Sequence, residues 1–579
     1  MKKRINKPCF LKFLVWLILL GTISYNSIGQ EDSIARKILD KRGELYIRFI
    51  RPGNLSVQSL ANRMSIDKIS RQKSGNEITA YLNSREYEEF IQKGIKYEIL
   101  TAPSIQLAAT MCSDLTAAKN WNCYPDYNQY VQLMQSFQDN YPDLCKRVEF
   151  GQSEEGRKLL AVKISDNVNS DEEEPDFLYT STMHGDEVTG YVLMLRLINY
   201  LLTNYGTDQR ITDLVNSTEI WINPLSNPDG TFNSGNTTVT GATRFNSNGI
   251  DLNRNYPYAF NGTNPNAVET ENLAMIDFMK QNHFVFAANL HGGEEVVNYP
   301  WDYYLSSEKI HADDNWYIDV SREYVDTVHA NSDNYMISLD NGITNGGDWY
   351  VVYGSRQDYN NYFLHNRETT MEISSIKMPD ASTLPNYWNY NFRSFLNYIN
   401  EVHSGIYGKI TDQDGNPLRA KITLLQYDKD SSEVYSNPVN GMYYRMLSDG
   451  TYHINATLAG YSQADSVVTV SNGTPELVNL VLKKDPVFIN EPENNGFNVL
   501  IAENPVNEIL KISIQTITND RIKFTITDMK GAIISENNLE THIGSNKFFI
   551  DVKKLQSGIY FCKFGNNQYQ VTQKIVKVE

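Results

Sequence analysis

The sequence is poor in cysteine and contains no long apolar segment. Five cysteines among 579 residues are too few for a fold held together mainly by disulfides. The longest uncharged apolar run, Phe13–Ile23, is well short of the ~20 residues that span a bilayer. We therefore expect no transmembrane segment in the mature chain.

Positive charge is also scarce, because 52 Lys and Arg side chains stand against 69 Asp and Glu and leave a net charge of −17. A chain this acidic binds phosphate backbones and anionic lipid poorly, which argues against nucleic-acid and membrane-surface partners and favours cationic substrates. The apolar share of 41% is typical of a folded, globular chain.

Two common hydrolase signatures are absent. There is no His-Glu-x-x-His motif, which excludes a zinc site built on a single helix. There is no Gly-x-Ser-x-Gly turn either, since the nearest match, Gly151–Gly156, is one residue too long.

Residues 1–29 are expected to be a signal peptide. A basic start precedes the apolar run Phe13–Ile23, and Ser27 and Gly29 are small residues suited to cleavage before Gln30. The mature protein is therefore expected to be exported.

Four cysteines remain beyond this leader: Cys112, Cys123, Cys145 and Cys562. Cys123 and Cys145 flank one helical pattern, Tyr127–Tyr141, whose two ends they could link in an oxidising compartment. We expect a disulfide between these two. None of the cysteines is arranged as a zinc site.

The rest of the chain divides into four parts. Residues 30–105 show the order strand, helix, two strands, helix, strand, which predicts a small α+β domain. Residues 118–403 alternate apolar strands with longer helical patterns, which predicts an α/β domain with a largely buried sheet. Residues 404–484 and 495–579 show short alternating strands and turns, which predict two small all-β sandwich domains.

Two His-x-x-Glu pairs follow apolar strands in the α/β part: His184 with Glu187, and His291 with Glu294. Zinc hydrolases use three protein ligands and leave one position for water. Two pairs at strand ends can supply three ligands and one spare carboxylate. A single pair would more often be solvated loop residues.

The segment between the pairs, Arg244–Asn255, is polar, contains glycine and does not fit a regular element. Its two guanidiniums can bind a carboxylate or a developing oxyanion. Without further context, the segment is better explained as a surface loop with ordinary ion pairs.

The order of several short motifs along the chain is similar to that of a known family. Residues 118–403 resemble the zinc carboxypeptidase family, in particular its regulatory type, which includes carboxypeptidases D, E and N. The motifs in question are, in order, His184-x-x-Glu187, Asn227-Pro228-Asp229-Gly230, Arg244-x-Asn246, Asp251-Leu252-Asn253-Arg254-Asn255, Asn289-Leu290-His291-Gly292-Gly293, Asn298-Tyr299-Pro300, Gly342-Ile343-Thr344-Asn345-Gly346, Trp349-Tyr350, Gln357-Asp358 and Glu372.

This resemblance implies an α/β fold with a mixed sheet and one Zn²⁺ cofactor. Its ligands would be His184, Glu187 and His291, which leaves Glu294 as a bystander. Asp251 would orient a zinc-bound histidine, most simply His184. The simpler reading of Asp251 is a turn residue.

The resemblance also assigns the remaining chemistry. Glu372 matches the general base that activates the attacking water, and Arg244 matches the residue that steadies the oxyanion. The family residues that bind the terminal carboxylate of the substrate correspond here to Asn253, Arg254 and Tyr350. Among 37 tyrosines, Tyr350 could also be a packing residue.

A pocket for the last side chain of the substrate is implied by Asp302, eleven residues after the third zinc ligand, and by Gln357. A carboxylate there favours C-terminal Arg or Lys. The alternative is an Asp302 that ends a strand and faces solvent. The chain departs from the family pattern at Ser355, usually Gly, and at Arg356, whose charge would oppose the preference by neutralising Asp302.

The flanking parts resemble further modules. In the order of their elements, residues 30–105 resemble a procarboxypeptidase activation domain. Residues 404–484 resemble the transthyretin-like domain of regulatory carboxypeptidases in the motifs Asp414-Gly415-x-Pro417, Tyr443-Tyr444-Arg445 and Gly460-Tyr461. Residues 495–579 resemble the sorting domain of the type IX secretion system. That resemblance implies type IX secretion machinery as a partner. It also implies a secreted or cell-surface protein exported through the periplasm of a Gram-negative bacterium.

These features predict a secreted zinc metallocarboxypeptidase that acts on peptide or protein C-termini. A peptidoglycan-cleaving amidase or endopeptidase on the same fold is the nearest alternative, and the intact Asn253 and Arg254 argue against it. A non-catalytic surface adhesin would be expected to have lost a metal ligand or Glu372, and the sequence retains them all.

Overall fold

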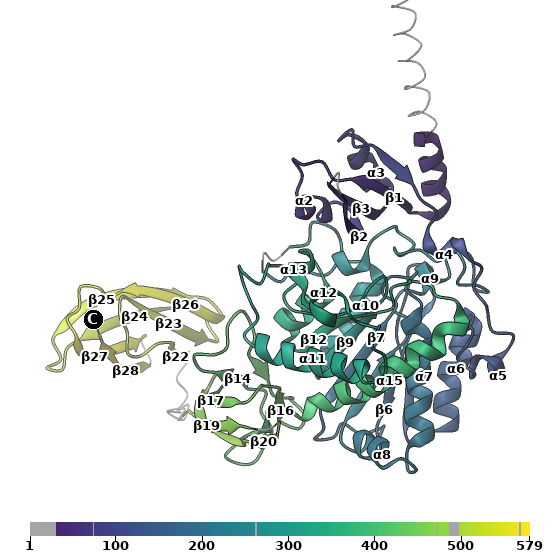
Figure 1. Cartoon of the computed structure of the whole chain (residues 1–579). Coiled ribbons are helices and arrows are strands. Elements are labelled where there is room, and N and C mark those ends of the chain that lie inside the picture. The colour runs from purple at the N-terminus through teal and green to yellow at the C-terminus, as the bar shows by residue number, and fades with distance from the viewer. Residues whose placement is uncertain are drawn as a thin grey trace, which may run out of the picture. The chain divides into compact units, whose positions relative to one another are not determined.

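The computed structural model describes residues 31–72, 75–260, 263–471, 473–485, 497–566 and 569–578. The expected signal peptide, residues 1–29, lies outside these ranges. The chain up to Asp485 forms one compact unit and the chain from Pro486 a second, and each is described by itself (Figure 1). No helix within the described ranges is long and apolar enough to cross a membrane.

Residues 31–100 form a small α+β domain with the predicted order of elements (Figure 1). Its antiparallel sheet has the order β2-β3-β1-β4. A helix over residues 31–42, which the sequence patterns above do not predict, precedes the sheet. The elements are β1 (Leu45–Ile50), α2 (Val57–Ala61), β2 (Ser65–Gln72), β3 (Gly75–Leu82), α3 (Ser84–Ile91) and β4 (Tyr97–Ile99).

Residues 118–403, the predicted catalytic domain and here named the catalytic part, are built on an eight-stranded mixed sheet with the order β11-β10-β12-β9-β7-β8-β6-β5. Its central strands β12, β9, β7 and β8 are parallel to one another and are buried over nearly their whole length, as predicted. The strands are β5 (Cys145–Gln152), β6 (Lys158–Ile164), β7 (Asp176–Ser181), β8 (Glu219–Asn223), β9 (Phe284–His291), β10 (Glu295–Tyr299), β11 (Ile343–Asn345) and β12 (Arg367–Ile373).

Helices cover both faces of this sheet. Along β7, Phe177 and Tyr179 belong to the core formed with α6, α7, α11 and α15, whereas Leu178 belongs to the core formed with α10. Because side chains alternate across a strand, the two cores lie on opposite faces. The long helices are α6 (Tyr127–Asn140), α7 (Thr189–Asn204), α8 (Gln209–Val215), α10 (Thr270–Gln281), α11 (Asp314–His329) and α15 (Leu384–Asn400).

Short helical turns fill the loops: α4 (Pro103–Gln106), α5 (Leu115–Ala118), α9 (Pro228–Thr231), η1 (Leu252–Arg254), α12 (Ser338–Gly342), α13 (Gly346–Trp349), α14 (Arg356–Tyr359), η2 (Asn360–Leu364), η3 (Ala381–Thr383) and η4 (Glu401–His403).

The predicted disulfide between Cys123 and Cys145 is wrong. Cys123 pairs with Cys112 instead, with Cα atoms 5.0 Å apart, and Cys145 is buried as a free thiol at the start of β5. The 14 residues of α6 separate Cys123 from Cys145, which at 1.5 Å per residue is about 21 Å of helix. A disulfide needs Cα atoms roughly 4.4–6.8 Å apart, so two cysteines that flank a helix of this length can pair only if the chain folds back along it.

A β-sandwich follows the catalytic part. One sheet has the order β16-β13-β21-β18, with β20 pairing to β13, and the other has the order β15-β14-β17-β19. Arg445 on β16 joins it to the catalytic part through two 2.7 Å contacts with Asp313. The strands are β13 (Ile406–Asp412), β14 (Lys421–Leu424), β15 (Val434–Tyr435), β16 (Met442–Arg445), β17 (Gly450–Thr457), β18 (Tyr461–Ser462), β19 (Ala464–Val470), β20 (Glu476–Leu477) and β21 (Leu480–Lys484).

The second unit is all-β, with the sheets β22-β23-β26 and β25-β24-β27-β28 around one apolar core. Its strands are β22 (Phe497–Ile501), β23 (Ile509–Thr516), β24 (Asp520–Thr527), β25 (Ile533–Thr541), β26 (Gly544–Asp551), β27 (Gly558–Gly565) and β28 (Gln570–Lys577).

Candidate active site

Three predicted metal ligands converge where β7 and β9 end. His184 and Glu187 lie in the turn after β7, and His291 is the last residue of β9, its parallel neighbour. The Glu187 carboxylate lies 3.0 Å from Nδ1 of His184 and 2.9 Å from Nδ1 of His291, and the two nitrogens are 3.0 Å apart. These three side chains form a group able to hold one metal ion.

The outer nitrogen of each histidine has its own acceptor. Nε2 of His184 lies 3.1 Å from a carboxylate oxygen of Asp251, and Nε2 of His291 lies 2.5 Å from the amide oxygen of Asn289. Donation from Nε2 leaves the Nδ1 lone pairs directed at the shared point, as zinc requires. Burial lowers the pKa of His291 to about 4, which keeps that ring neutral. The donor set therefore fits zinc.

The sequence reasoning assigned no role to Asn289, although it stands in the Asn289-Leu290-His291 motif. It also missed Lys377, whose Nζ donates to Glu187 at 2.6 Å. Burial alone would raise the pKa of Glu187, but the His184 ring and the Lys377 ammonium outweigh it and hold the pKa well below its usual range. Glu187 is therefore an anion at neutral pH.

Arg244 lies beside the metal group. Its Nε and Nη2 are each 3.0 Å from Oδ2 of Asp251, and its Nη1 is 3.3 Å from Glu187. Burial opposes ionisation of Asp251, but Arg244 prevails and keeps the pKa of that carboxyl well below its usual range. Asp251 thus orients both His184 and Arg244.

Glu372 lies on β12 directly opposite His291 in the strand register. Its Oε2 is buried and has no hydrogen-bond partner within the described residues. Burial, and then the charge of Glu187, raises the pKa of Glu372 well above its usual range. Glu294 stands apart from the metal group and accepts a hydrogen bond from Ser338 at 3.1 Å.

Most of the predicted site residues line one small cavity of about 40 Å³, and Asp251 and Gln357 lie behind its wall. Asn253 accepts a hydrogen bond from the backbone N–H of Arg356 at 3.0 Å. Nε of Arg254 is buried without a partner in the described part of the chain. The predicted residues on the cavity wall are His184, Glu187, Arg244, Asn253, Arg254, His291, Asp302, Tyr350 and Glu372.

Asp302 is only 4% exposed, so it does not face solvent. The amide of Gln357 donates to it at 3.1 Å. Gly346 lies so close that a Cβ there would sit 1.9 Å from Oδ1 of Asp302. Burial raises the pKa of Asp302 to about 6.

The expected effect of Arg356 on this pocket does not occur. Its guanidinium is fully buried, contacts Thr180 and pairs with Glu368 at 3.0 Å. Its charge is therefore balanced by Glu368 and does not neutralise Asp302.

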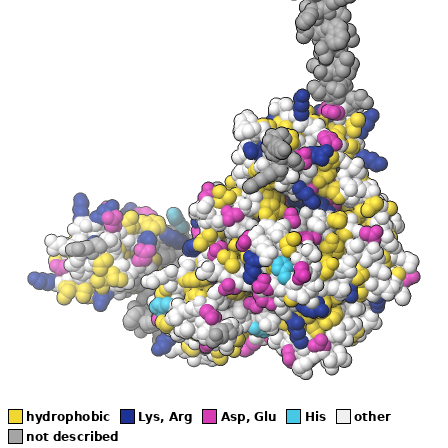
Figure 2. All heavy atoms as spheres, viewed as in Figure 1, with side chains coloured by type: hydrophobic (Ala, Val, Ile, Leu, Met, Phe, Trp, Pro, Cys, Tyr) yellow, Lys and Arg dark blue, Asp and Glu magenta, His cyan; other side chains and the backbone are white. Residues whose placement is uncertain are grey.

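The N-terminal domain closes the mouth of the cavity. Figure 2 shows this domain lying directly on the catalytic part. Ser65 donates to Asp251 at 2.5 Å, and Asp67 pairs with Lys377 at 3.3 Å. Ile66 and Asp67 of β2 form part of the cavity wall.

Comparisons with known proteins bear on this site. Residues 130–394 match a family model described as zinc carboxypeptidase. The chain is 34% identical over 417 residues to carboxypeptidase D of Homo sapiens, covering 69% of this chain and 29% of that protein. It is 34% identical over 373 residues to carboxypeptidase M of Mus musculus, covering 61% of this chain and 82% of that protein. The chain thus spans less than a third of carboxypeptidase D.

A crystal structure of carboxypeptidase A from Helicoverpa armigera aligns with a TM-score of 0.47 at 16% identity, covering 61% of this chain and 96% of that one. At the other end, residues 503–578 match a secretion system C-terminal sorting domain. The match over residues 130–394, together with the coverage of carboxypeptidase M, shows that the chain belongs to the zinc carboxypeptidase family.

Proposed function

We propose that this protein is a zinc-dependent carboxypeptidase that releases single C-terminal residues, preferably Arg or Lys, from peptides or proteins. The observation that carries the proposal is one cavity whose wall includes a metal-binding group, the cationic Arg254 and Glu372, whose Oε2 has no partner among the described residues. A bound zinc ion supplies a Lewis acid and lowers the pKa of water.

The side chains around that ion have separate roles in the proposed reaction. Glu372 takes a proton from the attacking water and passes it to the leaving amine. Arg244, held by Asp251, donates to the oxyanion. The terminal carboxylate of the substrate is gripped by Asn253, Arg254 and Tyr350. The Asp302 carboxylate then pairs with the cationic side chain of the last residue.

The flanking domains have proposed roles of their own. Residues 31–100 cover the cleft as an activation domain would, and residues 404–484 form a transthyretin-like support. The sorting domain directs export through the periplasm of a Gram-negative bacterium to the cell surface or medium, with residues 1–29 as leader. The disulfide between Cys112 and Cys123 fits such an oxidising route.

Two variants test the chemistry. Glu372→Gln removes the base but no metal ligand, so we expect one zinc per chain to remain while kcat/KM falls about 10²–10⁴-fold. His184→Ala should lose zinc and activity together. The measurements are zinc content and release of the last residue from peptides that differ only there.

Wild-type turnover by Glu372→Gln would overturn the mechanism. Cleavage within a peptide, or of amidated C-termini at the same rate as free ones, would instead favour the amidase or endopeptidase alternative.

A further inference from the structure

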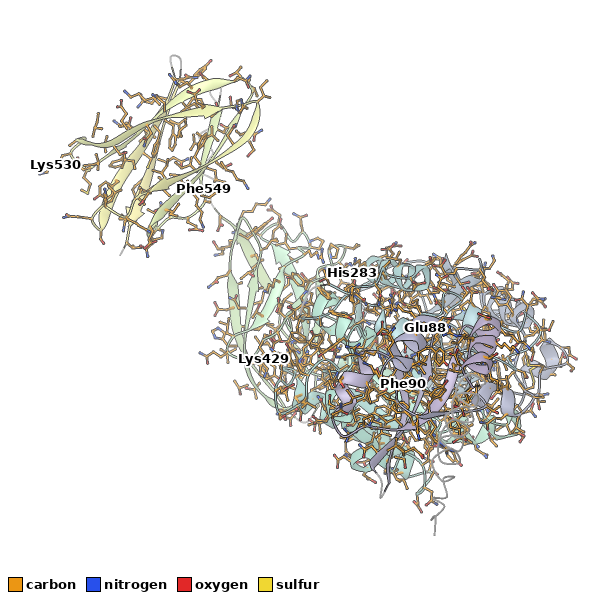
Figure 3. The ribbon with its side chains drawn as sticks, turned by 90° about the horizontal axis from the view of Figure 1, so that it is seen from above. Glu88, Phe90, His283, Lys429, Lys530 and Phe549 are labelled. Carbon is orange, nitrogen blue, oxygen red and sulfur yellow. A yellow bond between two sulfur atoms is a disulfide. The ribbon has the colours of Figure 1, made fainter. Side chains whose placement is uncertain are left out.

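A second and larger cavity lies at the opposite end of the central strands of the catalytic sheet, where these strands begin. Its volume is about 530 Å³, within the range of ~300–1,000 Å³ that is typical of small-molecule sites. The active site lies where β7 and β9 end, whereas this cavity is lined by the first residues of three strands: Asp176 of β7, Phe284 of β9 and Arg367 of β12. Strands β15 and β16 of the β-sandwich form its other wall. Figure 3 labels one lining residue, His283, on the side of the catalytic part toward the β-sandwich.

The cavity contains polar atoms that the protein leaves unsatisfied. Asn366 is 2% exposed, and neither its amide nitrogen nor its amide oxygen has a hydrogen-bond partner in the described residues. Nε of Arg445, also buried, has none either. Buried polar groups in native proteins are almost always paired, so an amide and a guanidinium nitrogen left open on facing walls of one cavity indicate a missing partner.

The Asn366 side of the cavity is cationic. The ring of His365, the residue before Asn366, lies 4.9 Å from that of Tyr435, and Arg419 lies 5.6 Å above the same Tyr435 ring. Arg419 forms no ion pair within the described part of the chain, whereas Arg445 is neutralised by Asp313 and Asp428. Asn366 and Arg419 together can hold a carboxylate.

The other side of the cavity is acidic. Glu174 precedes β7 and Asp176 begins it, and Oε2 of Glu174 is buried without a partner among the described residues. Burial, reinforced by Glu172, raises the pKa of Glu174 to about 8. A cation placed beside this carboxyl would lower that pKa and satisfy the open oxygen.

The spacing between the two sides follows from the sheet. Strand β9 separates β7 from β12, so their first residues are about 10 Å apart at ~4.8 Å per strand. A hydrogen bond at each end takes up about 6 Å of that span, so a molecule that joins the two sides needs a cation and a carboxylate at least about 4 Å apart and within the ~7 Å length of two extended residues. We propose that this cavity binds a small zwitterion of that length, either a basic amino acid or a dipeptide, with its carboxylate at Asn366 and Arg419 and its cation at Glu174.

Isothermal titration of the full chain tests the proposal. All variants carry Glu372→Gln so that dipeptides are not consumed. L-arginine, L-lysine and Ala-Ala are the probes, and agmatine, which lacks the carboxylate, and acetate, which lacks the cation, are their controls. We expect saturable binding of at least one zwitterion, and binding at least 10-fold weaker for agmatine and acetate.

Variants locate the binding. Arg419→Ala and Glu174→Gln should each weaken it at least 10-fold. Arg393→Ala, which removes an exposed arginine over Phe392, and Asp302→Ala in the active site should leave it unchanged. The ranking of L-arginine, L-lysine and Ala-Ala separates the amino acid from the dipeptide.

Absence of saturable binding by every zwitterion would overturn the proposal. So would binding of acetate as tight as that of L-arginine, or binding that Asp302→Ala abolishes and Arg419→Ala does not, because that result would place the ligand in the active site. None of these outcomes depends on whether the protein hydrolyses peptides.

Discussion

Asp302 is buried, accepts a hydrogen bond from Gln357 and has its pKa raised to about 6 by burial. Its carboxyl is therefore neutral below about pH 6 and charged above it. We expect the preference for C-terminal Arg over Leu, measured as the ratio of the two kcat/KM values, to rise between pH 5 and pH 7.5. Taking the ratio cancels the protonation of Glu372 and the metal ligands, which affects both substrates alike.

Asp302→Ala is the matched variant for this prediction. Losing one partner of a buried charge pair costs about 2 kcal/mol or more, so the Arg to Leu ratio at pH 7.5 should fall at least about 30-fold and stop depending on pH. A wild-type ratio that stays constant across this range would show that Asp302 does not contact the substrate.

Gly346 offers a second residue-scale test. A Cβ at this position would lie 1.9 Å from Oδ1 of Asp302 and 2.7 Å from Oδ1 of Asn298. Gly346→Ala must displace the carboxylate, and overpacking of this kind costs about 1–3 kcal/mol. We expect roughly a 10-fold fall in kcat/KM for peptides ending in Arg and a smaller fall for those ending in Leu. Gly53→Ala, whose Cβ meets nothing within 4 Å, is the control; an equal loss for both peptides would contradict the placement.

The limits of sequence reasoning at this scale are physical. The convergence of His184, Glu187 and His291 could be predicted because each stands in a motif of fixed spacing at a strand end. Glu372 followed only from its place in the family order of motifs. Lys377 could not, since its partners Glu187 and Asp67 are far away in the sequence. The pairing of Cys123 was predicted wrongly, because the two cysteines chosen flank a helix whose ends lie about 21 Å apart.

Among the elements, the four central strands of the catalytic sheet were predictable and the outer ones were not. Strands β7 and β8 are buried along their whole length and read as continuous apolar runs. Strand β5 alternates irregularly between buried and exposed residues, and β11 has only three residues, so neither gives a clear periodic signal.

Strand β2 of the N-terminal domain determines access to the site. Ser65 contacts Asp251 and Asp67 contacts Lys377, which leaves about 40 Å³ of cavity, too little for a peptide end. We expect release of this domain to raise kcat/KM on peptides at least 10-fold. A specific protease site inserted beside Leu107, which is 68% exposed in the linker, allows the domain to be cut off after folding.

The uncut form of the same insertion variant is the control for this test. Gel filtration must show that the cut domain has dissociated before rates are compared. An unchanged rate after dissociation would mean that β2 leaves the cleft freely and that the domain acts only in folding.

At the scale of the whole molecule, the chain combines a site that the N-terminal domain closes with a C-terminal part that matches a secretion sorting domain. Residues from Pro486 onward form a compact unit with its own apolar core, and residues 503–578 match a secretion sorting domain. Because the core of this unit is separate from that of the catalytic part, its removal should leave the rest of the chain folded.

We therefore expect deletion of residues 497–579 to separate export from catalysis. The shortened protein should accumulate in the periplasm with its zinc content and peptide hydrolysis intact, whereas the full chain reaches the cell surface or the medium. The measurement is activity in fractionated cells. Residues 497–579 fused to an unrelated exported protein should carry that protein to the surface, which controls for loss of folding. If the shortened chain hydrolyses peptides at the cell surface as much as the full chain does, the signal for export to the surface lies in another part of the sequence.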